Sequence, residues 1–359
     1  MRTSRRLARR GVFALWLLAC LAGGLGVLEL ALRSGALAIA FRTPTGTFVL
    51  DPVLLYRLKP GSRPDLDARG RRFDPRGGRP RATRRILLSG DSFAFGSNVA
   101  PHESIAARLE RRLPAEFGVT NLGVHGYGPD QSLLLLRRSL GELAPELVVF
   151  TVFPANDFAD LARNRIFEPA GEHGAIRQRE ENVLHEALPA LWSAVPVALR
   201  LPPVHQPAWI PALLGAFFGD RYDTDLLLDP DSRSSREKRL LMQGVLREVR
   251  DEVRRAGAAL LVVVLPSYQQ FVSPLLTERG VSRERLFYAE ELVVELCAAE
   301  GIPSLDVREA FLEHPEPAEL FDREDHHLSP RGYARVAALV AKEIRTRKLV
   351  EPDPVDNRE

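Results

Sequence analysis

The chain of 359 residues contains little cysteine and no excess of charge of either sign. Its two cysteines, Cys20 and Cys297, lie far apart in the sequence, which excludes a disulfide framework and a CxxC metal site. The 49 basic and 47 acidic residues leave a formal net charge of +2, so no global field indicates nucleic acid as a partner. A phosphate-binding GxxxxGK motif followed by Ser or Thr is also missing, which leaves nucleotide hydrolysis without a phosphate cradle.

The histidines are too scattered to indicate a metal site. There are eight, and only His326 and His327 are adjacent. Side chains of neighbouring residues diverge, so we expect no shared metal ion there, and no cofactor. The 45% apolar content and the length suffice for one large domain with appendages or for two small domains. They exclude disorder, collagen and coiled coil as the main state.

The N-terminal region has the pattern of a membrane anchor. Five arginines precede an apolar stretch, Gly11 to Leu32, whose only charge is Glu29. A helix of this length reaches roughly 33 Å, enough to cross the hydrocarbon layer of a bilayer. A cleaved signal peptide or lipidation at Cys20 are the alternatives. We predict a retained single-pass anchor over residues 1–40, with a cytoplasmic N-terminus by the positive-inside rule. The rest of the chain is then periplasmic or extracellular.

A basic segment rich in proline and glycine follows. Residues 57–85 carry eleven basic side chains against three acidic ones, without apolar periodicity. We interpret 41–83 as a stalk, with a solvated linker favoured over an irregular segment that wraps the next domain. Beside a membrane, such a segment could also rest on anionic head groups.

From residue 84 to residue 350, short apolar strands alternate with amphipathic helices. Strands without polar alternation, separated by helices, indicate a parallel sheet covered on both faces. The predicted strands are 85–89, 119–122, 147–153, 259–265 and 302–307, and the predicted helices are 103–113, 131–143, 236–256, 283–300 and 330–345. The alternation breaks at about 158–235, which we interpret as an insertion that packs on the domain, with a lid or a membrane-dipping loop as alternatives. Residues 351–359 form a polar tail.

Polar residues follow successive strands, where ligands of parallel sheets bind. Ser92 follows the first strand, either as a nucleophile at a strand-to-helix turn or as an ordinary N-cap. Gly126 lies in a glycine-containing turn after the second strand, and Asn156 follows the third with an amide that could face an oxyanion. Before the last helix, Asp325 and His327 fit a general base with its orienting carboxylate, or a loop at a helix start.

Together these residues resemble the blocks of the SGNH (GDSL-type) hydrolases. Gly90-Asp91-Ser92 is similar to the first block, Gly126 to the second-block glycine, Asn156 to the third-block asparagine, and Asp325 with His327 to the fifth block. The resemblance covers about 84–157 and 259–346. It implies a flavodoxin-like three-layer αβα sandwich with about five parallel strands.

Two departures from the family pattern concern the site. Pro154 stands where the family usually has a glycine two residues before the asparagine. Glu324, not aspartate, lies three residues before His327, and Asp325 lies two before it. This spacing resembles a variant in membrane-associated SGNH proteins that acetylate or deacetylate polysaccharides. We expect Asp325 to be the carboxylate, Glu324 to be the alternative, and His326 to have no role in the chemistry.

The resemblance implies a serine esterase or acyl hydrolase. Ser92 is the expected nucleophile, His327 its base and Asp325 the orienting carboxylate, while Ser92 N–H, Gly126 N–H and the Asn156 amide form the oxyanion hole. The expected substrate is an ester-bearing small molecule, glycan or lipid, with O-deacetylation at the cell envelope as one candidate reaction. The alternatives are a polysaccharide O-acetyltransferase with the same residues and a catalytically silent domain that binds glycan or serves as a scaffold.

Overall fold

The computed structural model describes residues 2–33, 47–51, 53–79, 82–171, 174–179, 225–272 and 280–350. The chain divides into two compact units, and the described residues up to Arg57 belong to the first while those from Leu58 onward belong to the second. The polar tail predicted at 351–359 lies outside the described residues. Each unit is considered by itself.

The first unit contains one long helix and a two-stranded sheet. Helix α1 (Arg2–Arg33) covers the stretch predicted to be a membrane anchor. Strands β1 (Phe48–Asp51) and β2 (Leu55–Leu58) pair with each other, and the Asp51 carboxylate accepts the Leu54 N–H at 2.8 Å in the turn between them. Within the described part of the chain, no helix has both the length and the hydropathy required to span a membrane. The anchor therefore stays a prediction.

The second unit is built on a five-stranded parallel sheet, as predicted. Its strand order is β4-β3-β5-β8-β9. The strands are β3 (Arg84–Ser89), β4 (Phe117–Asn121), β5 (Leu147–Val152), β8 (Ala259–Val264) and β9 (Ser304–Asp306). Every residue of β5 is buried, which explains why this strand is uniformly apolar rather than alternating. The order reverses between β3 and β5, so a ligand crevice is expected at the carboxyl ends of these strands.

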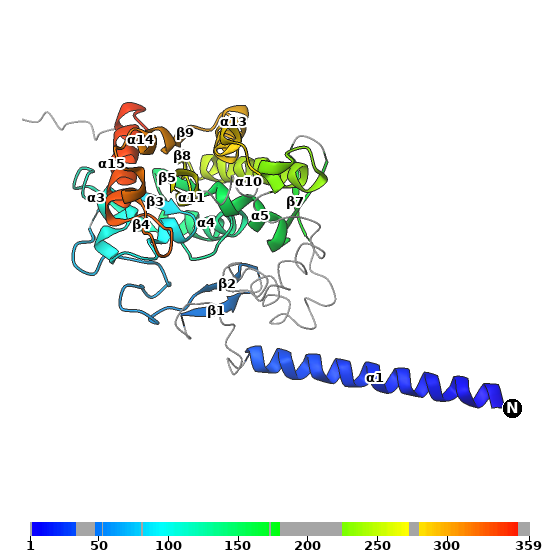
Figure 1. The fold of residues 1–359 in the computed structure, drawn as a ribbon. Coiled ribbons are helices and arrows are strands. Elements are labelled where there is room, and N and C mark those ends of the chain that lie inside the picture. The colour runs from blue at the N-terminus through cyan, green and yellow to red at the C-terminus, as the bar shows by residue number, and fades with distance from the viewer. Residues whose placement is uncertain are drawn as a thin grey trace, which may run out of the picture. The chain divides into compact units, whose positions relative to one another are not determined.

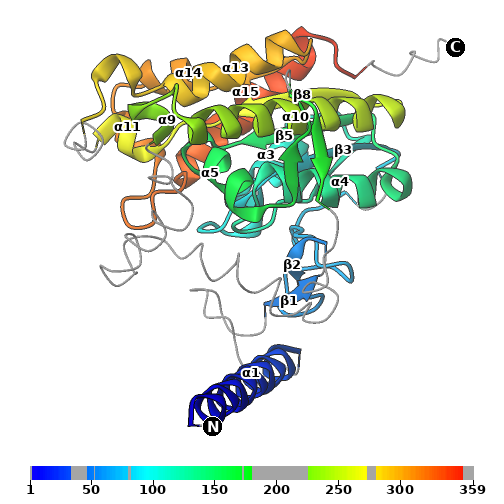
Figure 2. The ribbon, with the colours of Figure 1, turned by 90° about the vertical axis from the view of Figure 1, so that its right-hand side faces the viewer.

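Helices cover both faces of the sheet (Figure 1). One layer contains α3 (Ile105–Glu110) and α15 (Pro330–Thr346), which pack against each other. Figure 2 is turned toward the other layer, which contains α4 (Pro129–Leu143), α5 (Pro154–Asn164), α10 (Arg233–Arg255) and α13 (Tyr288–Ala299). Alternate strand residues therefore face different layers. Leu88 and Val149, for example, join Val336 and Val340 of α15 in one apolar core.

Shorter elements connect these layers. They are α2 (Ser92–Phe95), η1 (Pro101–Glu103), β6 (Phe167–Pro169), β7 (Ile176–Gln178), α9 (Asp225–Leu228), α11 (Tyr268–Val272), η3 (Arg283–Arg285), α14 (Arg308–Leu312) and η4 (Pro317–Leu320). The described ends of the predicted insertion are the rest of α5, the antiparallel β6–β7 pair and α9. The Lys238 amine, itself buried, forms an ion pair of 2.6 Å with Asp225 and ties α9 to α10. Residues 180–224 of the predicted insertion lie outside the described residues.

Residues 58–79 are not the solvated linker that their composition favours. Leu58, Leu66 and Arg72 are buried, and Arg72 forms an isolated antiparallel bridge with Asn121 at the end of β4. The segment therefore wraps against the domain. Periodicity does not reveal this packing, because the buried residues are spaced irregularly among exposed charges.

Candidate active site

The turn after β3 presents Ser92 at the carboxyl edge of the sheet. Gly90 has φ +154°, and a Cβ at this position would lie 1.9 Å from Thr151 Oγ1, so only glycine fits. The Asp91 carboxylate accepts the Phe93 N–H at 2.9 Å and caps α2. Ser92 is the first residue of the helix, so the interpretation of Ser92 as an N-cap is wrong. Its hydroxyl is left available for another partner.

That partner is His327, 235 residues further along the chain. His327 Nε2 lies 2.8 Å from Ser92 Oγ, which is hydrogen-bond distance. On the other side of the ring, Nδ1 lies 3.3 Å from Asp325 Oδ2, within ion-pair distance although not aligned as a hydrogen bond. Asp325 Oδ1 also accepts the backbone N–H of His327 at 3.0 Å. The structure thus brings Ser92, His327 and Asp325 together.

The loop that carries Asp325 and His327 is organised by Asp322, which the sequence analysis missed. Asp322 Oδ1 accepts the N–H groups of Glu324 and Asp325, and its own N–H donates to the His327 carbonyl at 2.7 Å. In the described part of the chain, no interaction joins the Glu324 carboxylate to His327. An aspartate side chain that accepts the backbone N–H two residues further along is typical of an Asx-turn, so Asp322 was a recognisable turn residue in the sequence.

The electrostatics of the loop favour an ionised Asp325. Burial alone would raise the pKa of this carboxyl, but the hydrogen-bonding and charge interactions with His327 outweigh burial and lower it. His326 turns to a different neighbour: its ring stacks on Tyr268 at 4.5 Å, and its Nδ1 lies 3.0 Å from the Gln269 amide nitrogen. A carboxylate beside His327 is suited to holding an imidazole that gains charge.

The Phe93 ring links three parts of the site. Its centroid lies 4.7 Å from that of His327 and 4.3 Å from that of Phe153. Phe153 immediately precedes α5, whose first turn contains Asn156. Pro154 is the first residue of this helix, a position whose N–H has no intrahelical partner, so the departure from the family pattern costs no hydrogen bond. Within the described residues, the Asn156 side-chain oxygen is buried without a hydrogen-bond partner.

Gly126 lies in the loop after β4, on the other side of β3. It is exposed and has φ +69°. The loop is held close to the nucleophile turn, because Val124 N donates to the Gly90 carbonyl at 3.1 Å. A Cβ on Gly123 would lie 2.3 Å from the Phe95 nitrogen, so this part of the loop also requires glycine. Both predicted oxyanion positions therefore flank the turn that carries Ser92.

His125 and Ser97 form a second link that the sequence analysis missed. His125 Nδ1 lies 2.6 Å from Ser97 Oγ, and Ser97 Oγ donates to the Ser92 carbonyl at 3.1 Å. Burial, with the nearby His327, Arg63 and Arg72 charges, lowers the pKa of His125 to about 3, so the ring is neutral. Because the hydroxyl has one proton, we assign the Nδ1 proton to His125 as the donor to Ser97. The residue before Gly126 is thus connected to the backbone of Ser92.

Buried carboxyl groups lie beneath the site. Burial raises the pKa of Asp91 to about 6. Burial and the charges of Asp91 and Asp160 raise the pKa of Asp157 well above its usual value, and one Asp157 oxygen accepts the Phe153 N–H at 2.7 Å. Among the residues that the structure describes, no three His, Cys, Asp or Glu side chains are arranged to hold a metal ion.

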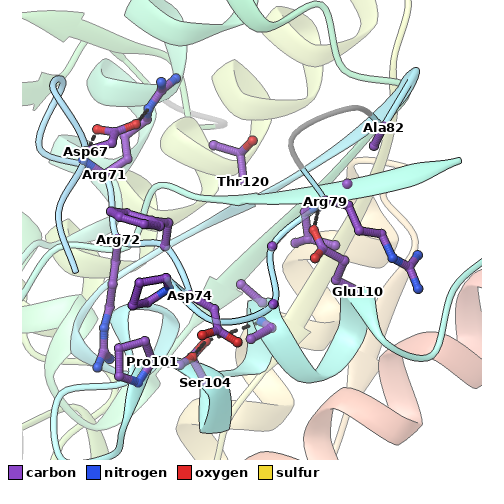
Figure 3. Close-up of a pocket in the computed structure, with 18 of the residues that line it drawn as sticks. Asp67, Arg71, Arg72, Asp74, Arg79, Ala82, Pro101, Ser104, Glu110 and Thr120 are labelled. Atoms are coloured by element: carbon purple, nitrogen blue, oxygen red, sulfur yellow. Dashed lines mark hydrogen bonds and ion pairs between the residues drawn. The ribbon is translucent and has the colours of Figure 1, made fainter. Parts of the chain in front are cut away.

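A pocket of about 670 Å³ lies elsewhere, between the wrapping segment, α3 and β4 (Figure 3). Its lining includes Arg71, Asp74, Arg79, Glu110 and Thr120, and it contains none of Ser92, Asp325 and His327. The Arg79 guanidinium donates to the Pro114 carbonyl at 2.6 Å, and Arg71 pairs with Asp67 at 2.7 Å. These two basic groups therefore already have protein partners, and the pocket is separate from the residues that surround Ser92.

The sequence is similar to a known protein family. A family model described as the GDSL-like lipase/acylhydrolase family matches residues 88–335. No curated protein matches the sequence. Among solved structures, a lipase/acylhydrolase from Enterococcus faecalis is 16% identical, with 74% of this chain and 96% of that chain covered and a TM-score of 0.43. An acetyl xylan esterase, AlAXEase, is 11% identical, with 72% and 99% covered and a TM-score of 0.42. Because the family model spans more than half of the sequence, the chain belongs to the GDSL-like lipase/acylhydrolase family and is an SGNH hydrolase.

Proposed function

We propose that the protein is a serine esterase in which Ser92, His327 and Asp325 act together on a carboxylic ester. The observation that carries the proposal is the 2.8 Å distance between Ser92 Oγ and His327 Nε2. A hydroxyl becomes an effective nucleophile when a positioned base accepts its proton during attack. Asp325, at 3.3 Å from His327 Nδ1, is the group that orients this base.

The reaction has two halves. As Ser92 Oγ attacks the ester carbonyl, its proton passes to His327 Nε2, and the imidazolium is stabilised by the Asp325 carboxylate. The proton then passes to the leaving alcohol, and the acyl group stays on Ser92. In the second half, His327 takes a proton from water as the water attacks the acyl-enzyme. The bond between the acyl carbon and Ser92 Oγ then breaks, His327 returns the proton to Ser92 Oγ, and the acid is released.

The negative charge that develops on the carbonyl oxygen during attack is stabilised by hydrogen-bond donors that are already in position. We assign this role to Ser92 N–H, Gly126 N–H and the Asn156 amide. Supporting observations are the location of Ser92 at the first residue of α2, the attachment of the Gly126 loop to the Gly90 carbonyl, and the Phe93–Phe153 contact beside Asn156. Loss of one such donor typically raises a barrier by about 3–4 kcal/mol.

The decisive experiment is covalent labelling. The wild-type protein should react with a fluorophosphonate probe and hydrolyse a short-chain aryl ester, whereas Ser92→Ala should do neither. Ser139→Ala is a matched control, because Ser139 Oγ only donates to the Leu135 carbonyl within α4. Labelling of Ser92→Ala at the wild-type rate would remove Ser92 from its role. Products measured with and without sugar acceptors would separate hydrolysis from acyl transfer.

We also propose that the enzyme acts outside the cytoplasm on an ester-bearing glycan, lipid or small molecule, with O-deacetylation as the first reaction to test. The support for this location is the run of arginines before the apolar stretch Gly11 to Leu32. Protease added to intact bacterial spheroplasts that express the full chain should digest the hydrolase domain. Complete protection, with digestion only after lysis, would contradict the location while leaving the esterase proposal intact.

A further inference from the structure

The wrapping segment, residues 58–79, precedes the part of the chain that matches the family model, which begins at residue 88. It nevertheless reaches the helix that carries Ser92. The contact is made by Arg72, whose side chain is only 2% exposed. Burying a guanidinium costs free energy unless its N–H groups find hydrogen-bond acceptors. The acceptors of Arg72 therefore identify the part of the protein that it stabilises.

The Arg72 guanidinium binds the carboxyl end of α2. Its Nη1 donates to the Phe95 carbonyl at 2.8 Å and also to the Gly96 carbonyl, and its Nη2 donates to the Val99 carbonyl at 2.7 Å. The cation also lies over the Phe95 ring, 4.7 Å from its centroid. The last carbonyls of a helix lack partners within the helix, and here one side chain satisfies several of them.

Arg72 is itself held in place. Its Nε donates to Asp65 at 2.9 Å, and the same carboxylate accepts two bonds of 2.8 Å from Arg63. Phe73 N donates to the Asp65 carbonyl at 3.0 Å, which closes the turn between them. A Cβ on Gly96 would lie 2.9 Å from Arg72 Nη1, so the glycine leaves room for the guanidinium. The fork geometry of arginine, rather than charge alone, fits this arrangement.

Helix α2 is a single turn, so its two ends are coupled. Gly96 N donates to the Ser92 carbonyl at 2.9 Å, and Ser97 N donates to the same carbonyl at 3.2 Å. Gly96, one of the residues that Arg72 binds, is therefore bonded directly to the backbone of Ser92, and Phe95 N donates to the carbonyl of the preceding residue, Asp91, at 3.0 Å. A shift of the helix at Phe95 or Gly96 would move Ser92 Oγ relative to His327.

We propose that Arg72 is a positioning residue for the nucleophile, so that the functional hydrolase domain begins near Leu58 and not at the first strand of its sheet. The inference rests on the proposed function of Ser92. Misplacement of a reacting atom by about 1 Å can cost on the order of 100-fold in rate. Arg72 acts through α2 and does not touch the reacting atoms.

The test compares Arg72→Met and Arg72→Lys with Arg69→Met in the full-length chain. Arg69 lies in the same turn, but its side chain is 61% exposed and pairs with Glu142 of α4 instead of binding α2. We expect Arg72→Met to lower kcat on an aryl ester and the fluorophosphonate labelling rate by about 100-fold, with KM changed less than about 2-fold. Arg72→Lys should fall between Arg72→Met and the wild type, because a lysine supplies charge without the fork. Arg69→Met should match the wild type.

Two further measurements separate positioning from general stability. Hydrogen exchange of the peptide covering residues 90–99 should accelerate in Arg72→Met, while peptides from β8 and α10 stay unchanged. If Arg72→Met does not fold, Asp65→Asn takes its place, with an expected labelling rate about 10-fold below that of the wild type. A normal kcat and labelling rate in the folded Arg72→Met protein, or in Asp65→Asn, overturns the proposal. Failure of the Ser92→Ala test instead overturns the proposed function.

Discussion

The Asn98 side-chain amide donates a hydrogen bond of 3.0 Å to the carbonyl of Leu328. Asn98 lies just beyond the nucleophile helix, and Leu328 immediately follows His327. The side-chain oxygen of Asn98, Oδ1, accepts a hydrogen bond of 3.3 Å from the buried Tyr333 hydroxyl. Asn98 therefore joins the segments that carry Ser92 and His327, although 230 residues separate it from Leu328 in the sequence.

Replacing this asparagine should loosen the contact between Ser92 and His327. We expect Asn98→Ala to lower kcat on an aryl ester about 10- to 100-fold, since reacting groups lose their alignment. Tyr333→Phe removes only the second hydrogen bond, so it should cost about 1 kcal/mol of unfolding free energy with little effect on kcat. Steady-state kinetics and urea unfolding of both variants check the prediction. Equal kcat values for Asn98→Ala and the wild type would show that the loops hold their alignment without this bridge.

The identity of the carboxylate beside His327 can be settled with two single substitutions. Asp325→Asn should lower kcat by about 10⁴-fold, because an amide cannot stabilise the imidazolium or hold the same tautomer. Glu324→Gln should leave kcat within about 2-fold, since Glu324 contributes its backbone N–H to Asp322 and not its carboxylate to His327. Active-site titration with the fluorophosphonate probe supplies the concentration of competent enzyme for both. The reverse pattern would transfer the role to Glu324.

Asn156 offers a direct test of the oxyanion hole. Asn156→Ala should lower kcat by about 10²- to 10³-fold while KM changes little, because the donor acts on charge that develops only in the transition state. Asn156→Asp retains the side-chain size and removes the amide donor, so its kcat should be at least as low. Initial rates over a range of ester concentrations give both constants. A loss confined to KM would place Asn156 in substrate binding instead.

Stability should depend on pH through Glu290. Burial raises the pKa of this carboxyl from 4.5 to about 7, and one of its oxygens accepts a hydrogen bond of 2.8 Å from the Gln270 amide. The folded state therefore keeps a proton that the unfolded state releases. The associated stability is fully present below about pH 4.5 and is lost as the pH rises through about 7.

The matching experiment is urea unfolding at pH 5 and pH 8. Relative to Glu290→Gln, the wild type should lose at most about 3 kcal/mol of unfolding free energy between these values. Glu291→Gln is the control, because the Glu291 side chain is 50% exposed and pairs with Arg308. It should follow the wild type. If the unfolding free energies of the wild type and Glu290→Gln change with pH in parallel, Glu290 has the same pKa in the folded and the unfolded protein, which contradicts the prediction.

The sheet could be predicted because its strands are buried on both faces, which leaves uninterrupted apolar runs such as Leu147–Val152. Long helices were equally visible: α10 occupies Arg233–Arg255 where 236–256 was predicted. The predicted helix 283–300 is instead η3 followed by α13, because Phe287, between them, has a non-helical φ of −110° and ψ of 13°. Such a local break is not visible in apolar spacing.

The reactive residues could be predicted because each lies directly after a strand or before a helix, in a recognisable block. The supporting residues could not. Arg72, Ser97 and Asn98 act through contacts with backbone carbonyls of other segments, and nothing in the spacing of their neighbours encodes such partners. The same reason explains why residues 58–79 were interpreted as a linker: one buried arginine among others that are exposed or half-buried has no sequence signature.

The burial of Lys238 in its ion pair with Asp225 limits where a lysine-specific protease can cleave the folded protein. The sequence has four lysines, and the other three, Lys59, Lys342 and Lys348, are exposed. A lysine-specific protease therefore meets no accessible target between residues 60 and 341 of the folded protein. Brief digestion should therefore leave the chain from Pro60 to Ala341 in one piece, with Arg72 still joined to the segment that carries Ser92 and His327.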